Sequence, residues 1–163
     1  TKAFTRGVPL YCNLVALEDE HGPAVAVINL PALGLCVYAG RGLGCFENDQ
    51  PARVSSTTDL AGAYVSTSDL ERLPDALIAQ ARADGAVLRT WGDGYGYALV
   101  AAGRIDAMVD IGVTHWDLAP VPLIITEAGG RFTDVDGGLG ADNGSGVATN
   151  GHLHDTILEL LGR

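Results

Sequence analysis

The sequence predicts an α/β (α+β layered) fold in which an antiparallel sheet is followed by a smaller α/β layer. Short apolar runs separated by turn residues dominate the chain up to residue 67, and alternating helical and strand patterns follow from residue 68. The 163 residues include 22 glycines and 7 prolines, which favours short strands and tight turns. We therefore expect a single domain with a sheet-rich part at 1–67 and an α/β part at 68–163.

Antiparallel strands are expected where runs rich in Val, Ile and Tyr lie between turn residues. The segment 29–34 has the composition of a hairpin connection, and Gly40, Gly42 and Gly44 interrupt the chain again. The expected strands lie at residues 10–17, 24–30, 35–39 and 63–66.

Helices and strands are expected to alternate after residue 68. Ser68 or Asp69 can cap the first helix, and Gly85 can end it. The glycine pair at 129–130 can end a later helix in the same way. The expected elements are a helix at 69–83, a strand at 86–90, a helix at 94–102, a strand at 105–109, a helix at 116–128, strands at 131–133 and 147–149, and a terminal helix at 152–161.

Composition excludes several classes of partner. The chain has 10 Lys plus Arg and 20 Asp plus Glu, and its net charge of −10 opposes binding to nucleic acid or to an anionic membrane. Residues 21–38 lack Asp, Glu, Lys and Arg, but Gly and Pro interrupt them and argue against a membrane span. Cys12, Cys36 and Cys45 are odd in number and widely spaced, so we expect no disulfide framework and a cytoplasmic location.

Three aspartates are candidates for chemistry, and each also has a structural interpretation. Asp117 stands where a helix is expected to begin, so it can be an N-cap or an oxygen ligand for a hard cation such as Mg²⁺. Asp93 lies between two glycines and can belong to a turn or to a ligand pocket. Asp110 is expected at a strand end, either solvated or facing the same pocket.

Three segments resemble the inositol monophosphatase family. Residues 116–120 (WDLAP) and 124–130 (IITEAGG) are similar to its C-terminal signature, and residues 89–97 (RTWGDGYGY) are similar to a segment of its histidinol-phosphatase branch. Residues 1–9 (TKAFTRGVP) resemble the segment that follows an Asp-Pro-Ile-Asp-Gly motif in that family. The resemblance implies a sugar-phosphatase-like αβαβα sandwich, Mg²⁺-dependent hydrolysis of phosphomonoesters, and homodimers.

The resemblance also implies roles for particular residues. It makes Asp117 a metal ligand and gives the Thr1 hydroxyl the task of orienting the attacking water. It places five residues against the substrate: Gly92, Asp93, Gly94, Tyr95 and Asp110. Two carboxylates beside a metal suit a phosphate ester whose other end is cationic, and histidinol phosphate, from histidine biosynthesis, has such an amine. Inositol 1-phosphate and 3′(2′),5′-bisphosphate nucleotides are the alternative substrates.

The resemblance covers only the later part of the family pattern. The family's Gly-Glu-Glu motif and the two aspartates that precede position 1 supply most of its metal ligands, so the 163 residues are expected to carry half of the active site. On this hypothesis the N-terminal segment of the same enzyme is the missing partner, and the isolated chain binds metal poorly. The alternative from another class is a noncatalytic fragment that only binds or assembles with a partner chain.

Overall fold

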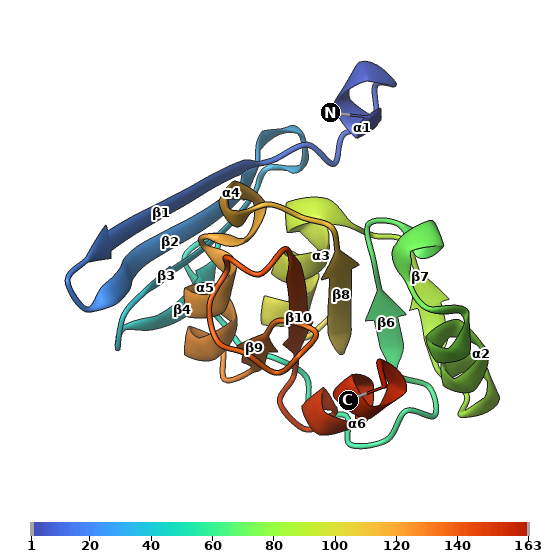
Figure 1. The fold of residues 1–163 in the computed structure, drawn as a ribbon. Coiled ribbons are helices and arrows are strands. Elements are labelled where there is room, and N and C mark those ends of the chain that lie inside the picture. Colours follow the sequence, from blue (N-terminus) through green and yellow to red (C-terminus); the bar gives the residue numbers. More distant parts are fainter. Residues whose placement is uncertain (1, 163) are drawn as a thin grey trace.

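Two five-stranded sheets with helices between them form the core of the molecule (Figure 1). The computed structural model describes residues 2–162. The helices α3 (Asp93–Ala101) and α5 (Val121–Glu127) lie between the sheets, whereas α2 (Asp75–Ala83) and α6 (His154–Leu160) cover the other face of the second sheet (Figure 1). This layered α/β arrangement confirms the predicted fold class.

The first sheet is entirely antiparallel, with its strands in chain order. Its strands are β1 (Asn13–Asp19), β2 (Gly22–Leu30), β3 (Leu35–Gly40), β4 (Gly44–Glu47) and β5 (Gln50–Ala52). The first three strands confirm the expected ones, and the 3₁₀ turn Pro31–Leu33 forms the predicted connection between β2 and β3. The strands β4 and β5 were not expected. They pair through a tight turn at Asn48 and Asp49, which both have positive φ and so give the hairpin the required twist.

The second sheet is mixed and has the order β7-β6-β8-β10-β9. Its strands are β6 (Tyr64–Ser66), β7 (Val87–Arg89), β8 (Ala107–Ile111), β9 (Arg131–Thr133) and β10 (Ser145–Thr149). The strand β6 pairs in parallel with β7 and β8, whereas β10 runs antiparallel to β8 and β9. The residues of β6 fall in the expected sheet-rich part at 1–67, yet they belong to this second sheet.

Two helices that the sequence predicts as continuous are interrupted next to prolines. The helix expected at 69–83 consists of a 3₁₀ turn, Leu70–Arg72, capped by Asp69, and of α2, which begins after Pro74. The helix expected at 116–128 is divided into α4 (His115–Leu118) and α5, with Pro120 between them. Proline has no N–H for the hydrogen bond to the preceding turn. Its ring also disfavours helical geometry in the residue before it, and Leu73 before Pro74 is extended, whereas Ala119 before Pro120 keeps helical dihedral angles.

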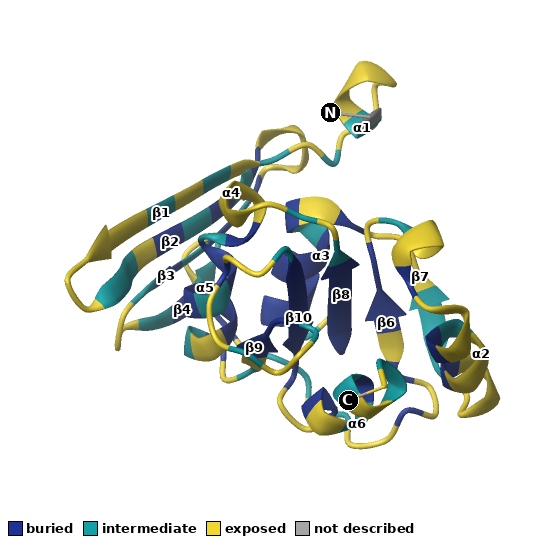
Figure 2. Ribbon diagram, in the orientation of Figure 1, coloured by how far each residue is buried: buried dark blue, intermediate teal, exposed yellow. Residues whose placement is uncertain are grey.

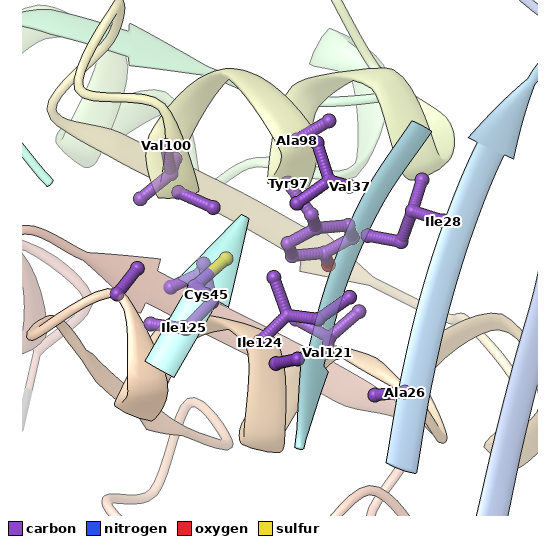
Figure 3. Close-up of a cluster of buried hydrophobic side chains, with 14 of the residues drawn as sticks. Ala26, Ile28, Val37, Cys45, Tyr97, Ala98, Val100, Val121, Ile124 and Ile125 are labelled. Atoms are coloured by element: carbon purple, nitrogen blue, oxygen red, sulfur yellow. The ribbon is translucent and has the colours of Figure 1, made fainter. Parts of the chain in front are cut away.

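The two hydrophobic cores lie on opposite faces of the second sheet. Figure 3 shows the first core, in which Ile28 and Val37 of the first sheet pack against Tyr97 of α3 and Ile124 of α5. The second core lies between the second sheet and the helices α2 and α6. The central strands β8 and β10 are therefore buried almost throughout (Figure 2).

The remaining helix, α1 (Lys2–Thr5), is a single turn near the N-terminal end of β1 (Figure 1). Within residues 2–162, the helices are too short or too polar to cross a membrane.

Candidate active site

Two adjoining cavities form a cleft near the C-terminal end of β8 and the start of α3. The larger, of about 460 Å³, extends to Arg72 and is called here the Arg72 lobe. The smaller, of about 250 Å³, extends to Asp117 and is called the Asp117 lobe. Both lobes are lined by Ser68, Asp93 and Asp110, so these residues mark the junction of the lobes. The cleft thus brings together the three aspartates that the sequence singled out.

Asp110 occupies the wall of the cleft as a buried carboxylate, only 2% exposed. Its Oδ1 accepts a hydrogen bond from the Ser68 N–H (2.8 Å), and its Oδ2 accepts from the Ser68 hydroxyl (3.0 Å) and the Tyr97 hydroxyl (3.1 Å). Burial raises the pKa of Asp110, while the hydrogen bonds from Ser68 and Tyr97 oppose that rise. The interpretation of Asp110 as a solvated strand end is therefore wrong.

Asp93 is the first residue of α3 and is exposed at the junction of the lobes. Its backbone is in the left-handed region, with φ of 52°, which is uncommon for a residue other than glycine. The Asp93 N–H donates a hydrogen bond of 2.7 Å to the Ser68 hydroxyl. This bond ties the strained start of the helix to the segment that follows β6.

Gly92 and Gly94, on either side of Asp93, allow the chain to pack closely at the cleft. A Cβ at Gly92 would overlap Ser68, and a Cβ at Gly94 would overlap the Cys12 thiol. Both glycines are buried and each lines one lobe, Gly92 the Arg72 lobe and Gly94 the Asp117 lobe. Their small size brings the backbone of α3 against two other segments of the site.

Asp117 lines the other end of the cleft from α4. The prediction that Asp117 could be the N-cap is wrong, because Thr114 is the N-cap and Asp117 is the third residue of a capping box. The Asp117 Oδ2 accepts from the Thr114 N–H (3.0 Å) and hydroxyl (2.6 Å). Among the described residues, no protein donor reaches Oδ1, so one carboxylate oxygen of this exposed side chain is free to bind a cation.

The negative charge of the cleft has no matching cation in the described part of the chain. None of the ion pairs within residues 2–162 includes Asp93, Asp110 or Asp117. Arg72 lines the larger lobe, but it is paired with Asp69 of the same lobe (3.5 Å), and its guanidinium donates to the carbonyls of Ile111 and Gly112. The cleft is therefore suited to a positively charged ligand.

One of the expected site residues does not join this cleft, and another lies outside the described residues. Tyr95 packs against the first hydrophobic core and lines neither lobe. Thr1 lies outside the described residues, so its expected role at the water stays a prediction. Asp117 and Asp93 have carboxylate oxygens that no protein donor among residues 2–162 reaches, but the described residues contain no group of three or more His, Cys, Asp or Glu side chains placed to bind a metal.

Sequence reasoning missed Ser68 and Tyr97 as members of the site. The helical spacing contains a signal for Tyr97, because it lies four residues after Asp93 and so on the same side of α3. Ser68 gives no such local signal, since it is 42 residues from its partner Asp110. Cys12 also lines the Asp117 lobe, but burial and the nearby aspartates raise its pKa, which disfavours a nucleophilic thiolate.

The fold has two layered sheets, and its acidic cleft lies where strands end and helices begin. These features define a class of α/β proteins that bind a ligand at that place. The chain belongs to the inositol monophosphatase family, whose family model matches residues 1–163.

Comparison with individual proteins agrees with this assignment. The histidinol-phosphatase of Mycobacterium tuberculosis is 40% identical over 99% of this chain and 65% of its own length. The histidinol-phosphatase of Chlorobaculum parvum is 38% identical over 99% of this chain and 64% of its own length. The solved structure of a Thermotoga maritima IMPase superimposes with a TM-score of 0.89 at 28% identity, over 99% of this chain and 64% of that one. The chain thus spans just under two thirds of the length of these relatives.

Proposed function

We propose that this chain carries part of the active site of a Mg²⁺-dependent phosphomonoester hydrolase that acts on histidinol phosphate. The observation that carries the proposal is the buried Asp110 carboxylate, which is held by neutral donors and has no ion-pair partner among residues 2–162. Burying an uncompensated charge is costly, and a cationic ligand group at the cleft would offset that cost.

The hydrogen bonds of Asp110 support this assignment of a ligand. Three donors occupy its two oxygens, whereas a carboxylate can accept about four hydrogen bonds. One acceptor position is therefore left for a substrate group such as an ammonium. Asp93, at the same junction, adds a second negative charge that attracts the same group.

Asp117 is the residue that we assign to the metal. Its free Oδ1 suits Mg²⁺, which prefers carboxylate oxygens, while the Thr114 bonds hold Oδ2 and so fix the direction of the side chain. Mg²⁺, when bound, would stabilise charge on the phosphoryl oxygens and make a bound water more acidic. One carboxylate is too few, so further ligands would come from beyond the described residues.

The cleft favours a cationic ester over the alternatives. An inositol phosphate presents hydroxyl groups, and a bisphosphate nucleotide presents additional negative charge that Asp93 and Asp110 would repel. The similarity to two histidinol-phosphatases supports the same ranking. Hydrolysis of inositol 1-phosphate is the second candidate, because the chain also resembles a Thermotoga maritima IMPase.

The test is phosphate release from histidinol phosphate and inositol 1-phosphate by the enzyme that contains this chain, with Mg²⁺ and after chelation. We expect a higher kcat/KM for histidinol phosphate, loss of activity on chelation, and recovery when Mg²⁺ is restored. Equal or better hydrolysis of inositol 1-phosphate would support the second candidate. No hydrolysis of either ester by the metal-loaded enzyme would support the noncatalytic alternative.

Replacing Asp117 tests the assignment of the metal ligand. Asp117→Asn keeps the shape of the side chain but weakens its interaction with a divalent cation, so we expect kcat to fall by about 1,000-fold or more. The matched control is Asp75→Asn, which changes an exposed carboxylate in the first turn of α2, away from the cleft. Near-normal turnover by Asp117→Asn would contradict the assignment.

A further inference from the structure

We propose that Ser68 is a positioning residue that couples the Asp110 carboxylate to the backbone of Asp93 and thereby sets the preference of the cleft for cationic ligands. This inference rests on the proposed function, because the cationic ligand is the substrate group assigned above. Ser68 lies two residues after the end of β6, lines both lobes, and contacts both of the aspartates at their junction.

On one side, Ser68 holds the carboxylate of Asp110 at both oxygens. Its N–H donates to Oδ1 (2.8 Å) and its hydroxyl donates to Oδ2 (3.0 Å). Two donors from one residue fix both the position and the plane of the carboxylate, which a single bond would leave free to rotate. The third donor, Tyr97, also reaches Oδ2 and lies in the buried wall behind it.

On the other side, the same hydroxyl holds the start of α3. The Ser68 Oγ accepts the Asp93 N–H at 2.7 Å, at the residue whose φ of 52° is in the left-handed region. A strained backbone conformation persists only when neighbouring contacts hold it. Gly92 packs directly on Ser68, which keeps the two segments at contact distance.

A hydroxyl can donate one hydrogen bond and accept others, so a single Ser68 side chain makes both connections at once. Alanine at this position would remove both. The Asp93 N–H would lose its acceptor, and Asp110 would lose one of the three donors that hold its oxygens. The two carboxylates would then no longer be held in one arrangement around a bound ammonium group, and discrimination in favour of the cation would fall.

Direct binding of the dephosphorylated amino alcohol tests the inference without metal or turnover. Calorimetry would compare L-histidinol with the analogue that lacks its amine, at a pH above the ordinary pKa of imidazole. The ratio of the two affinities measures preference for the ammonium group. We expect Ser68→Ala to lower this ratio about 10-fold, as weakening a partly desolvated charge interaction predicts, and Ser68→Thr, which keeps the hydroxyl, to retain most of it.

Ser66→Ala is the matched structural control. The Ser66 hydroxyl accepts from the Trp91 N–H (2.9 Å) and donates to the Trp91 carbonyl (3.2 Å). It therefore anchors the segment that leads into α3 to β6, without a bond to Asp110. We expect this variant to keep the affinity ratio even if it lowers the thermal midpoint. Exchange of the Asp93 amide hydrogen, followed by NMR, should become faster in Ser68→Ala, because its acceptor is removed.

The outcomes separate this inference from the proposed function. A wild-type preference for L-histidinol that persists in Ser68→Ala would overturn the role of Ser68 alone and leave the proposed substrate standing. An equal loss of the ratio in Ser66→Ala would also overturn it, because general anchoring of the segment would then explain the effect. Absence of any preference in the wild-type protein would overturn the cationic substrate and this inference together.

Discussion

Asp110 illustrates how the chemistry of a residue depends on partners that are distant in the sequence. Its place in β8 follows from the apolar run around it, which sequence analysis identified. Its buried hydrogen bonds depend on Ser68, which reaches it because β6 and β8 are parallel neighbours. Pairing between strands that are far apart in the sequence leaves no periodic signal. The position of Asp110 in a strand was therefore predictable, but its hydrogen-bond partners were not.

His154 provides a prediction for stability at the scale of one residue. It is fully buried, with its two ring nitrogens 3.0 Å from the hydroxyls of Thr133 and Thr149. Burial, with a smaller contribution from Arg131, lowers the pKa of His154 from 6.5 to about 4. The native state therefore holds a neutral imidazole, whereas the unfolded chain takes up a proton as the pH falls below 6.5.

The stabilisation that His154 contributes is complete above pH 6.5 and is lost as the pH falls toward 4, by up to about 3 kcal/mol. Urea unfolding at both ends of this range should show a smaller pH dependence in His154→Gln than in the wild-type chain. His21→Gln, which changes an exposed imidazole, is the control and should leave the dependence unchanged. An unaltered pH dependence in His154→Gln would contradict the buried neutral state.

At the scale of elements, local sequence signals located most helices and strands but not their interruptions. The glycine at position 85 ends α2 as expected, with φ of 85°. Pro74 and Pro120 lie at these interruptions, but the expected helices ran through both positions. The short strand β5 was missed because its three residues contain no alternation of apolar and polar side chains long enough to detect.

Glu127 links the last turn of α5 to the first sheet and gives a second stability prediction. Its carboxylate accepts the Gly42 N–H (2.7 Å) and the Gly44 N–H (2.8 Å), in the turn between β3 and β4. Glu127→Ala removes both acceptors and should lower the free energy of unfolding by about 2 kcal/mol. Glu159→Ala, at an exposed site in α6, is the control for loss of one negative charge.

Denaturant unfolding at matched ionic strength would measure both variants. We expect a larger loss of unfolding free energy in Glu127→Ala than in Glu159→Ala. Equal effects would show that these hydrogen bonds add little to the stability of the junction.

At the scale of the whole molecule, the cleft depends on segments from both sheets and from the helices between them. Cys12 precedes the first strand of one sheet, Asp110 is the next-to-last residue of a strand of the other, and Asp93 begins the helix that packs between them. The resemblance to the inositol monophosphatase family predicted that Asp93, Asp110 and Asp117 share a site. The shape of the two lobes depends on tertiary packing, which the sequence alone does not specify. The same is true of the lack of an ion-pair partner for these three aspartates within residues 2–162.

The most direct test of the central claim is the ratio of kcat/KM for histidinol phosphate to that for its analogue without the amine, in the wild-type enzyme and in Asp110→Asn. The substitution preserves size and removes the negative charge. We expect this ratio to fall about 100-fold, because a buried charge partner contributes a few kcal/mol. A ratio unchanged by Asp110→Asn, in a protein that still folds and turns over the analogue, would contradict it.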